Sequence, residues 1–207
     1  SEILCSLPLD IDAPALDQCG TCTLCLEACP TGAIVEPWVL DANRCVSYLT
    51  IELKDEIPEE LREAVGTHVY GCDVCQEVCP WNSQAGQSTD PAWQPDPILD
   101  QPQVADLWRQ PDEVLQPVIK GTAMARAGLR GVRRNIAVAL GNTDTPTAID
   151  ALSEVVPDDS RSDPLVKDHL VWSRRRRTWI PEGRRPPVHP VALVPSSRVV
   201  GTGRLRT

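Results

Sequence analysis

Apolar residues recur at helical spacing in the second half of the chain. Val132, Ile136 and Leu140 follow one another at intervals of four, and Gly141 comes directly after them. A stripe of this spacing places apolar side chains on one face of a helix, and glycine commonly ends a helix. The pattern therefore predicts an amphipathic helix that packs against a core and stops at Gly141.

Other helix signals flank this stripe. A short helix is predicted from Val104, and Asp112 is placed to cap the next one. Later, Thr145-Pro146 and Asp163-Pro164 each put a capping residue before a proline, and the two pairs lie eighteen residues apart. This repeat predicts a helical hairpin of the HEAT type.

The first half of the chain carries fewer helical patterns. Pro58 is followed by acidic residues and then by Gly66, which is a full set of start and stop signals for a helix. The residues after Cys45 are also predicted to continue as a helix. Elsewhere in this half, cysteine spacing is the dominant feature.

Composition divides the chain further. Its 207 residues carry a net charge of −9. Residues 174–207 hold nine arginines and one acid, which is a net charge of +8, so residues 1–173 carry a net charge of −17. No apolar run approaches the ~20 residues of a membrane span, so no membrane contact is expected. The acidic body does not suggest a general nucleic-acid binder, so any such contact is expected to be local.

The expected organisation is mostly α-helical, with a ferredoxin-like domain for two [4Fe-4S] clusters followed by a HEAT-like helical segment. The basic tail is predicted to be disordered, although an RNA-binding role and a reading-frame error are alternatives. The expected segments are a lead-in from a missing N-terminal domain (1–18), the cluster domain (19–82), a Pro-, Asp- and Gln-rich linker (83–103), the helical domain (104–173) and the tail (174–207).

Two cysteine runs carry the candidate chemistry. The first has the form C-x2-C-x2-C-x3-C-P, and the second has the same C-x2-C-x3-C-P ending without the opening cysteine. The first form is the ferredoxin-type run, whose fourth cysteine ligates the other cluster of a two-cluster unit. The runs comprise Cys19, Cys22, Cys25, Cys29 and Pro30, then Cys72, Cys75, Cys79 and Pro80.

The ligand count closes when Cys45 supplies the missing thiolate, because each cubane needs four. Zinc is a weaker alternative, since its sites usually show two C-x2-C pairs, and disulfides would require an oxidising compartment. The predicted sets are Cys19, Cys22, Cys25 and Cys79 for cluster 1, and Cys29, Cys45, Cys72 and Cys75 for cluster 2. Cys5 is expected to be a small buried residue, and His169 a core or boundary residue.

The segments CGTCTLCLEACPTGAI and NRCVSYLTIELKDEIPEELREAVGTHVYGCDVCQEVCPWN closely resemble epoxyqueuosine reductase, as does the later GTAMARAGLRGVRRNIAVALGN. The resemblance spans roughly residues 8–172. It implies a cytoplasmic oxidoreductase of queuosine biosynthesis that reduces epoxyqueuosine in tRNA to queuosine. An external donor would supply electrons, which would pass through the clusters to a cobalamin. By the same resemblance, Ser47 and Asp73 lie in segments that approach the corrin, with capping as the alternative role.

The family has an N-terminal domain that holds most of the cobalamin site and the acidic proton donor. Nothing in this chain corresponds to it, so we expect either a fragment or a chain that works with a separate partner. In both cases it has no catalytic residue of its own and should not reduce epoxyqueuosine alone. Alternatives are a free-standing two-cluster electron carrier and a relative of the cobalamin-dependent reductive dehalogenases. The helical segment argues against a carrier, and dehalogenases usually carry an export signal, which is not seen.

Four arginines within nine residues favour contact with tRNA. Arg126, Arg130, Arg133 and Arg134 can share much of one side of a helix, and the planar guanidinium suits phosphate. The alternative is a solvated face that pairs with the acids of residues 55–63.

Overall fold

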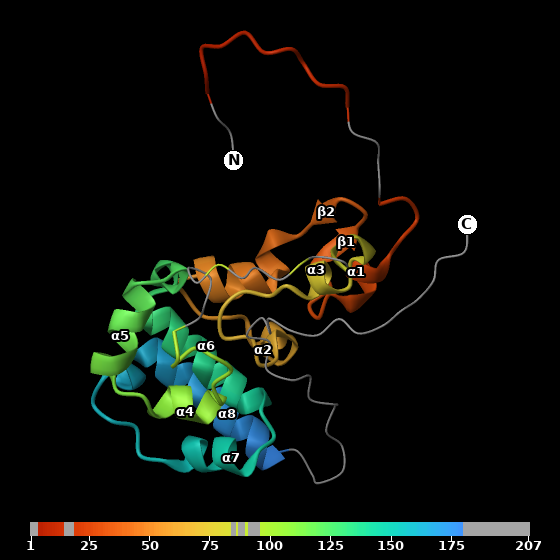
Figure 1. Cartoon of the computed structure of the whole chain (residues 1–207). Coiled ribbons are helices and arrows are strands. Elements are labelled where there is room, and N and C mark those ends of the chain that lie inside the picture. The colour runs from red at the N-terminus through yellow and green to blue at the C-terminus, as the bar shows by residue number, and fades with distance from the viewer. Residues whose placement is uncertain (1–3, 15–18, 84–85, 87–89, 91–95, 180–207) are drawn as a thin grey trace.

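The computed structural model describes residues 4–14, 19–83, 86, 90 and 96–179, and every structural statement below concerns these residues. Figure 1 shows a cysteine-rich part built of short elements, beside a part built of packed helices. The prediction of a mostly helical chain is confirmed. Within this part of the sequence, no helix is both long and apolar enough to cross a membrane.

The cysteine-rich part contains one two-stranded antiparallel hairpin and several short helices. Its elements are α1 (Leu24–Ala28), β1 (Ile34–Glu36), β2 (Val39–Leu40), the 3-10 turn η1 (Ala42–Arg44), the π-helical turn η2 (Tyr48–Glu52), α2 (Glu59–Val65), α3 (Val74–Glu77) and the 3-10 turn η3 (Pro80–Asn82).

The helical part contains five α-helices among the described residues. Its elements are α4 (Val104–Arg109), α5 (Asp112–Lys120), the 3-10 turn η5 (Ala123–Arg126), α6 (Gly128–Asn142), α7 (Pro146–Ser153), the 3-10 turn η6 (Ser160–Ser162) and α8 (Pro164–Trp179).

Several helix ends follow the predicted signals. Thr145 caps α7 by accepting a hydrogen bond from the N–H of Ala148, and Pro146 is the first helical residue. The backbone of Gly66 has a φ of 63° just after α2, where only glycine is unstrained. The segment after Cys45 is helical as predicted, but it forms the rarer π-helical turn η2.

Asp112 does not cap the helix that follows Pro111, which corrects the prediction. Its carboxylate instead accepts hydrogen bonds from the N–H and hydroxyl of Ser160 and from Arg133. Cys5 was expected to be buried and is exposed. Tertiary contacts and exposure of this kind leave no mark in local sequence spacing.

Helix α6 is the centre of the molecule. The predicted stripe of Val132, Ile136 and Leu140 is buried, but so is every other residue from 131 to 141. The main core gathers residues from α4 to α8 around α6. A second core joins residues 46–65 to Val138 of α6 and Trp172 of α8, so the two parts of the chain share one interior.

Gly141 was predicted to end α6 and does not, because the helix runs on to Asn142. A Cβ atom at residue 141 would lie 2.5 Å from the hydroxyl of Ser173 and 2.9 Å from the ring of Trp172. Glycine is therefore needed for the close approach of α8. That helix also continues through residues 174–179, which were predicted to belong to a disordered tail. Residues 180–207, and most of the predicted linker, lie outside the described residues.

His169 ties the two parts together from the core, as predicted for a buried residue. Its Nε2 accepts from the backbone N–H of Ile57 at 3.1 Å, so Nδ1 carries the proton and donates to the carbonyl of Leu165 at 2.7 Å. Burial lowers the pKa of His169 to about 4; Arg62 and Arg134 act in the same direction, and the bond to Leu165 opposes them. The imidazole is therefore neutral near pH 7.

We expect Gly141→Ala to destabilise the protein by about 1–3 kcal/mol, since the added methyl forces α8 away from α6. Urea unfolding measures the change. Gly131→Ala is the matched control, because it lies in the same helix and its Cβ would meet the Cβ of Ala127 at 3.4 Å. Alanine is the better helix former, so this control should keep or raise the stability. Equal losses in both variants would contradict the packing argument.

The unfolding free energy should fall as the pH drops from 6.5 to 4. Over this range the unfolded His169 gains a proton and the folded one does not, so the unfolded state is favoured. The difference of pKa corresponds to about 3 kcal/mol, with no further loss from this group below pH 4. Urea titrations at pH 7.5, 5.5 and 4 should give a steeper decline for the parent chain than for His169→Gln. Parallel curves would exclude His169 as the source.

Candidate metal centre

Seven of the eight predicted cluster ligands line one cavity of about 520 Å³ in the cysteine-rich part. They come from both cysteine runs and from the segment between them. Cys79 is outside the lining, at the start of η3. All nine cysteines fall within the described residues, and none is in a disulfide. The seven in the lining are Cys19, Cys22, Cys25, Cys29, Cys45, Cys72 and Cys75.

The two cysteine runs adopt the same local backbone. Helices α1 and α3 pack against each other, and each contains the middle cysteine of a C-x2-C-x3-C run. The residues before them, Thr23 and Asp73, have φ, ψ values of −118°, 6° and −111°, 13°. Cys29 and Cys79 follow these helices with equally matched values of −65°, 113° and −71°, 122°. The last cysteines of the two runs are thus local counterparts.

The sulfur of Cys29 lies in a small cage of hydrogen-bond donors. The backbone N–H of Ala33 donates to it at 3.2 Å, and the hydroxyl of Thr31 lies 3.8 Å away. Burial alone would raise the pKa of the Cys29 thiol, but the N–H groups of Ile34 and Ala33, together with Thr31, outweigh burial and lower the pKa. The cage therefore stabilises a thiolate, the form that binds metal.

The thiols of Cys72 and Cys75 have the opposite tendency. Burial raises the pKa of both, and the nearby sulfurs of Cys29 and Cys45 raise it further because neighbouring thiolates repel one another. Thiolates brought together in this way need a cation or a cationic cluster between them. Soft sulfur ligands around a half-buried cavity suit iron–sulfur clusters, so the chemistry of the donor set fits such a group. Among the described residues, no three such side chains are grouped closely enough to hold a single metal ion.

The hairpin of β1 and β2 forms a further wall of the cavity. Pro37 and Trp38 make its turn, and Trp38 has a φ of 68°, which is rare for a bulky residue. Trp38 as a residue is 80% exposed although it borders the cysteine cavity. Sequence reasoning missed Trp38. The available signal was Pro37 at the first central position of a turn. It did not point to Trp38, because turns of this type usually have glycine at the second central position.

Ser47 and Asp73 both line the cavity. The hydroxyl of Ser47 accepts from the N–H of Cys72 at 3.0 Å and donates to the carbonyl of the same residue at 3.3 Å. It therefore fixes the backbone at a predicted ligand. Asp73 precedes α3 without capping it through its side chain, and it is exposed.

The four arginines predicted to form one RNA-binding face are divided by the structure. Arg133 and Arg134 are fully buried, which corrects the expectation that they lie on a surface. Arg126 and Arg130 are exposed, with side-chain exposures of 68% and 54%. Arg126 pairs with Glu52, and Arg130 pairs with Asp163 at 3.1 Å.

The buried pair binds backbone carbonyls. Arg133 donates to the carbonyls of Leu107, Trp108 and Gln110, beside Asp112. Arg134 donates to the carbonyls of Leu49, Leu53 and Asp55 in the cysteine-rich part. Arginine spacing alone does not separate such a role from a surface patch.

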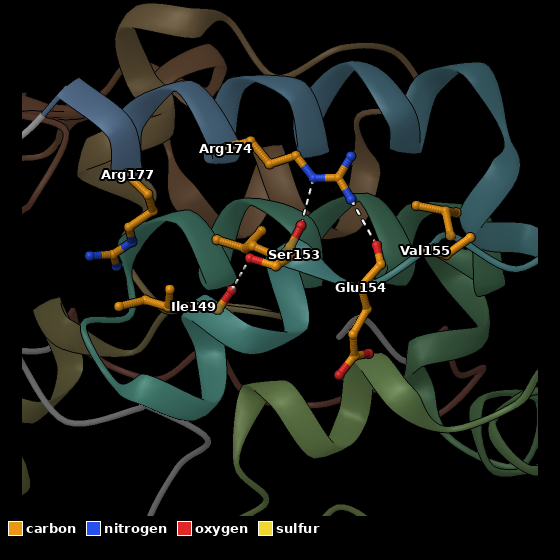
Figure 2. A pocket seen from close by; sticks show the side chains of 8 residues that line it. Ile149, Ser153, Glu154, Val155, Arg174 and Arg177 are labelled. Carbon is orange, nitrogen blue, oxygen red and sulfur yellow. Dashed lines mark hydrogen bonds between the residues drawn. The ribbon is translucent and has the colours of Figure 1, made fainter.

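A second cavity, of about 620 Å³, lies between α7 and α8 (Figure 2). Its polar groups are largely engaged by the backbone. Arg174 donates to the carbonyls of Leu152 and Glu154, and the hydroxyl of Ser153 donates to the carbonyl of Ile149. No predicted site residue lines it, so the cysteine cavity is the candidate site.

Known proteins match both the cysteine-rich part and most of the rest of this chain. A family described as a 4Fe-4S double cluster binding domain matches residues 18–82. The curated epoxyqueuosine reductase of Escherichia coli K12 is 43% identical over 175 residues, which are 83% of this chain and 45% of that protein. The enzyme of Pseudomonas aeruginosa is 42% identical over 177 residues, or 84% and 48%. The chain thus spans slightly less than half the length of these curated relatives.

Solved structures of epoxyqueuosine reductases also resemble this chain. An epoxyqueuosine reductase from Bacillus subtilis superposes with a TM-score of 0.71 and 34% identity, covering 82% of this chain and 45% of that one. A crystal structure of epoxyqueuosine reductase with an epoxyqueuosine-modified tRNA-Tyr stem loop also gives 0.71 and 34%, covering 82% and 44%.

Proposed function

We propose that this chain, which belongs to the epoxyqueuosine reductase family, is the electron-transfer and tRNA-binding part of such an enzyme. It spans slightly less than half the length of its curated relatives. The observation that carries this proposal is the convergence of two like-folded cysteine runs on one cavity. The proposed substrate is epoxyqueuosine in tRNA, the proposed product queuosine, and the compartment the cytoplasm.

Two [4Fe-4S] clusters would be held in the ligand sets predicted from sequence. Matched backbones at Cys29 and Cys79 support an exchange in which each serves the cluster of the other run. Besides burial, the sulfurs of Cys45, Cys29 and Cys25 all raise the pKa of Cys75, so both proposed sets lie close together in one cavity. The N–H groups around Cys29 would raise the potential of the cluster that it ligates.

A cobalamin, when bound, would supply the reducing metal centre that acts on the substrate. The residues of this chain proposed to lie beside it are Ser47 and Asp73 at the wall of the cysteine cavity. Ser47 would act by holding Cys72, whereas the exposed carboxylate of Asp73 is open to a polar group of the corrin. An external electron donor would reduce the clusters.

The helical part would extend the surface for tRNA. We assign residues 19–82 to a ferredoxin-like cluster domain, 83–103 to a linker and 104–179 to a HEAT-like domain, whose end moves from the predicted 173 to the last residue of α8. Arg126 and Arg130 are the arginines of the predicted cluster that remain exposed, so they are the proposed phosphate contacts.

The exchanged ligands can be tested by iron analysis. The anaerobically reconstituted chain should hold about eight iron atoms, and Cys29→Ser and Cys79→Ser should each disrupt a different cluster. The spectrum that remains in Cys29→Ser should match that of Cys45→Ser, because both lose cluster 2. The spectrum that remains in Cys79→Ser should match that of Cys22→Ser.

Cys5→Ser is the control and should keep the full iron content. A Cys29→Ser spectrum that matches Cys22→Ser would refute the exchange of ligands. The proposal that the parent chain holds two clusters would still stand. Failure of the parent chain to bind iron would refute the proposed function itself.

Replacing Arg126 and Arg130 together by glutamine should weaken tRNA binding and reduce its salt dependence. Each lost phosphate contact should lower the slope of log affinity against log salt by about 0.7–0.9. Fluorescence titrations at several salt concentrations measure this slope. Arg109→Gln is a matched control, since Arg109 is a partly exposed arginine paired with Glu154. Unchanged slopes in the double variant would leave both arginines as surface ion pairs.

A further inference from the structure

We propose that Asn135 of α6 is a positioning residue for cluster 2, which it serves by fixing the distance between the segment that carries Cys45 and the segment that carries Cys72. This inference rests on the proposed function, because it concerns one of the two proposed clusters. It assigns the helical part a direct role in the cluster centre, beyond its proposed contact with tRNA.

Asn135 reaches both ligand segments at once. Its side-chain amide donates to the carbonyl of Thr50 and to the carbonyl of Val69, each at 2.8 Å. Thr50 lies five residues after Cys45, and Val69 lies three residues before Cys72. The two N–H groups of one amide are a fixed distance apart, so they hold these two backbones in a defined register.

The orientation of this amide is determined by its neighbour. Arg134 donates to Oδ1 of Asn135 through Nε at 3.0 Å and through a terminal nitrogen at 2.9 Å. A guanidinium can only donate, so the oxygen of the amide must face Arg134 and the nitrogen must face the carbonyls. Asn135 has no exposed surface, and water therefore does not compete for these bonds.

The two ligand segments are also joined to each other. The hydroxyl of Thr50 donates to the carbonyl of Val46 at 2.8 Å and accepts from the N–H of Gly71 at 3.0 Å. Ser47, which lies in the same segment as Thr50, forms hydrogen bonds with both the N–H and the carbonyl of Cys72. Asn135 and Thr50 thus form one buried network that leads to Cys72 on one side and, through residue 46, to Cys45 on the other.

Helix α6 offers a matched control for this network. Asn142 also donates its amide to two carbonyls of the cysteine-rich part, those of Arg62 and Gly66, at 2.8 and 2.9 Å. These carbonyls belong to α2 and the residue after it, which carry no cysteine. Loss of Asn142 should therefore remove the same kind of bond without moving a ligand.

The test compares Asn135→Ala with Asn142→Ala in the reconstituted full chain. Iron release to a chelator and the midpoint potential of each cluster are followed by electron paramagnetic resonance, and Cys45→Ser identifies the signal of cluster 2 by its absence. In Asn135→Ala, cluster 2 should lose iron at least about tenfold faster, and its potential should shift, while cluster 1 keeps the parent values. Asn142→Ala should match the parent at both clusters.

A second pair guards against misfolding of Asn135→Ala. Thr50→Val removes the hydroxyl at nearly constant shape and should also speed iron loss from cluster 2 and shift its potential. Thr50→Ser keeps the hydroxyl and should give the parent values at cluster 2. Three outcomes would overturn the inference and leave the proposed function standing. These are parent-like iron release and potentials in every variant, equal changes at both clusters, or an equal change in Asn142→Ala. A parent chain without clusters would overturn both.

Discussion

The irregular segment after Cys45 depends on the buried guanidinium of Arg134. Neither a π-helical turn nor a loop satisfies all of its own carbonyls, and a buried carbonyl without a donor is strongly unfavourable. Arg134 bonds the carbonyls of Leu49, Leu53 and Asp55. Burial lowers the pKa of Arg134 to about 10, yet the group remains cationic near pH 7, so its bonds are charge-assisted.

Successive residues of α6 serve different parts of the molecule. Arg133 binds carbonyls at the end of α4 and in the turn before α5, and its charge is met by Asp112. Arg134 and Asn135 face the cysteine-rich part instead. A helix buried on all sides usually carries apolar residues throughout, whereas here polar side chains replace missing backbone partners. The relative position of the two parts is thus set by directional bonds as well as by apolar packing.

Sequence predicted the features that are encoded locally. The caps at Thr145 and Gly66 were predictable because each acts within a few residues. Burial of Arg133 and Arg134 was not predictable, because arginines at these spacings also suit an exposed face. The approach of Ser173 to Gly141 depends on a residue of another helix, which no local pattern reveals.

The bond between Ile57 and His169 joins residues 112 positions apart, and Arg62 meets Asp168 across 106. During synthesis, the cysteine-rich part leaves the ribosome well before α8. At about 5–20 residues per second, roughly 6 to 22 seconds separate the emergence of Ile57 from that of His169. Until α8 emerges, water bonds the N–H of Ile57 and the guanidinium of Arg62, and the second core lacks Trp172. The contacts that join the cysteine-rich part to α8 can therefore form only after nearly all of the described chain has been synthesised.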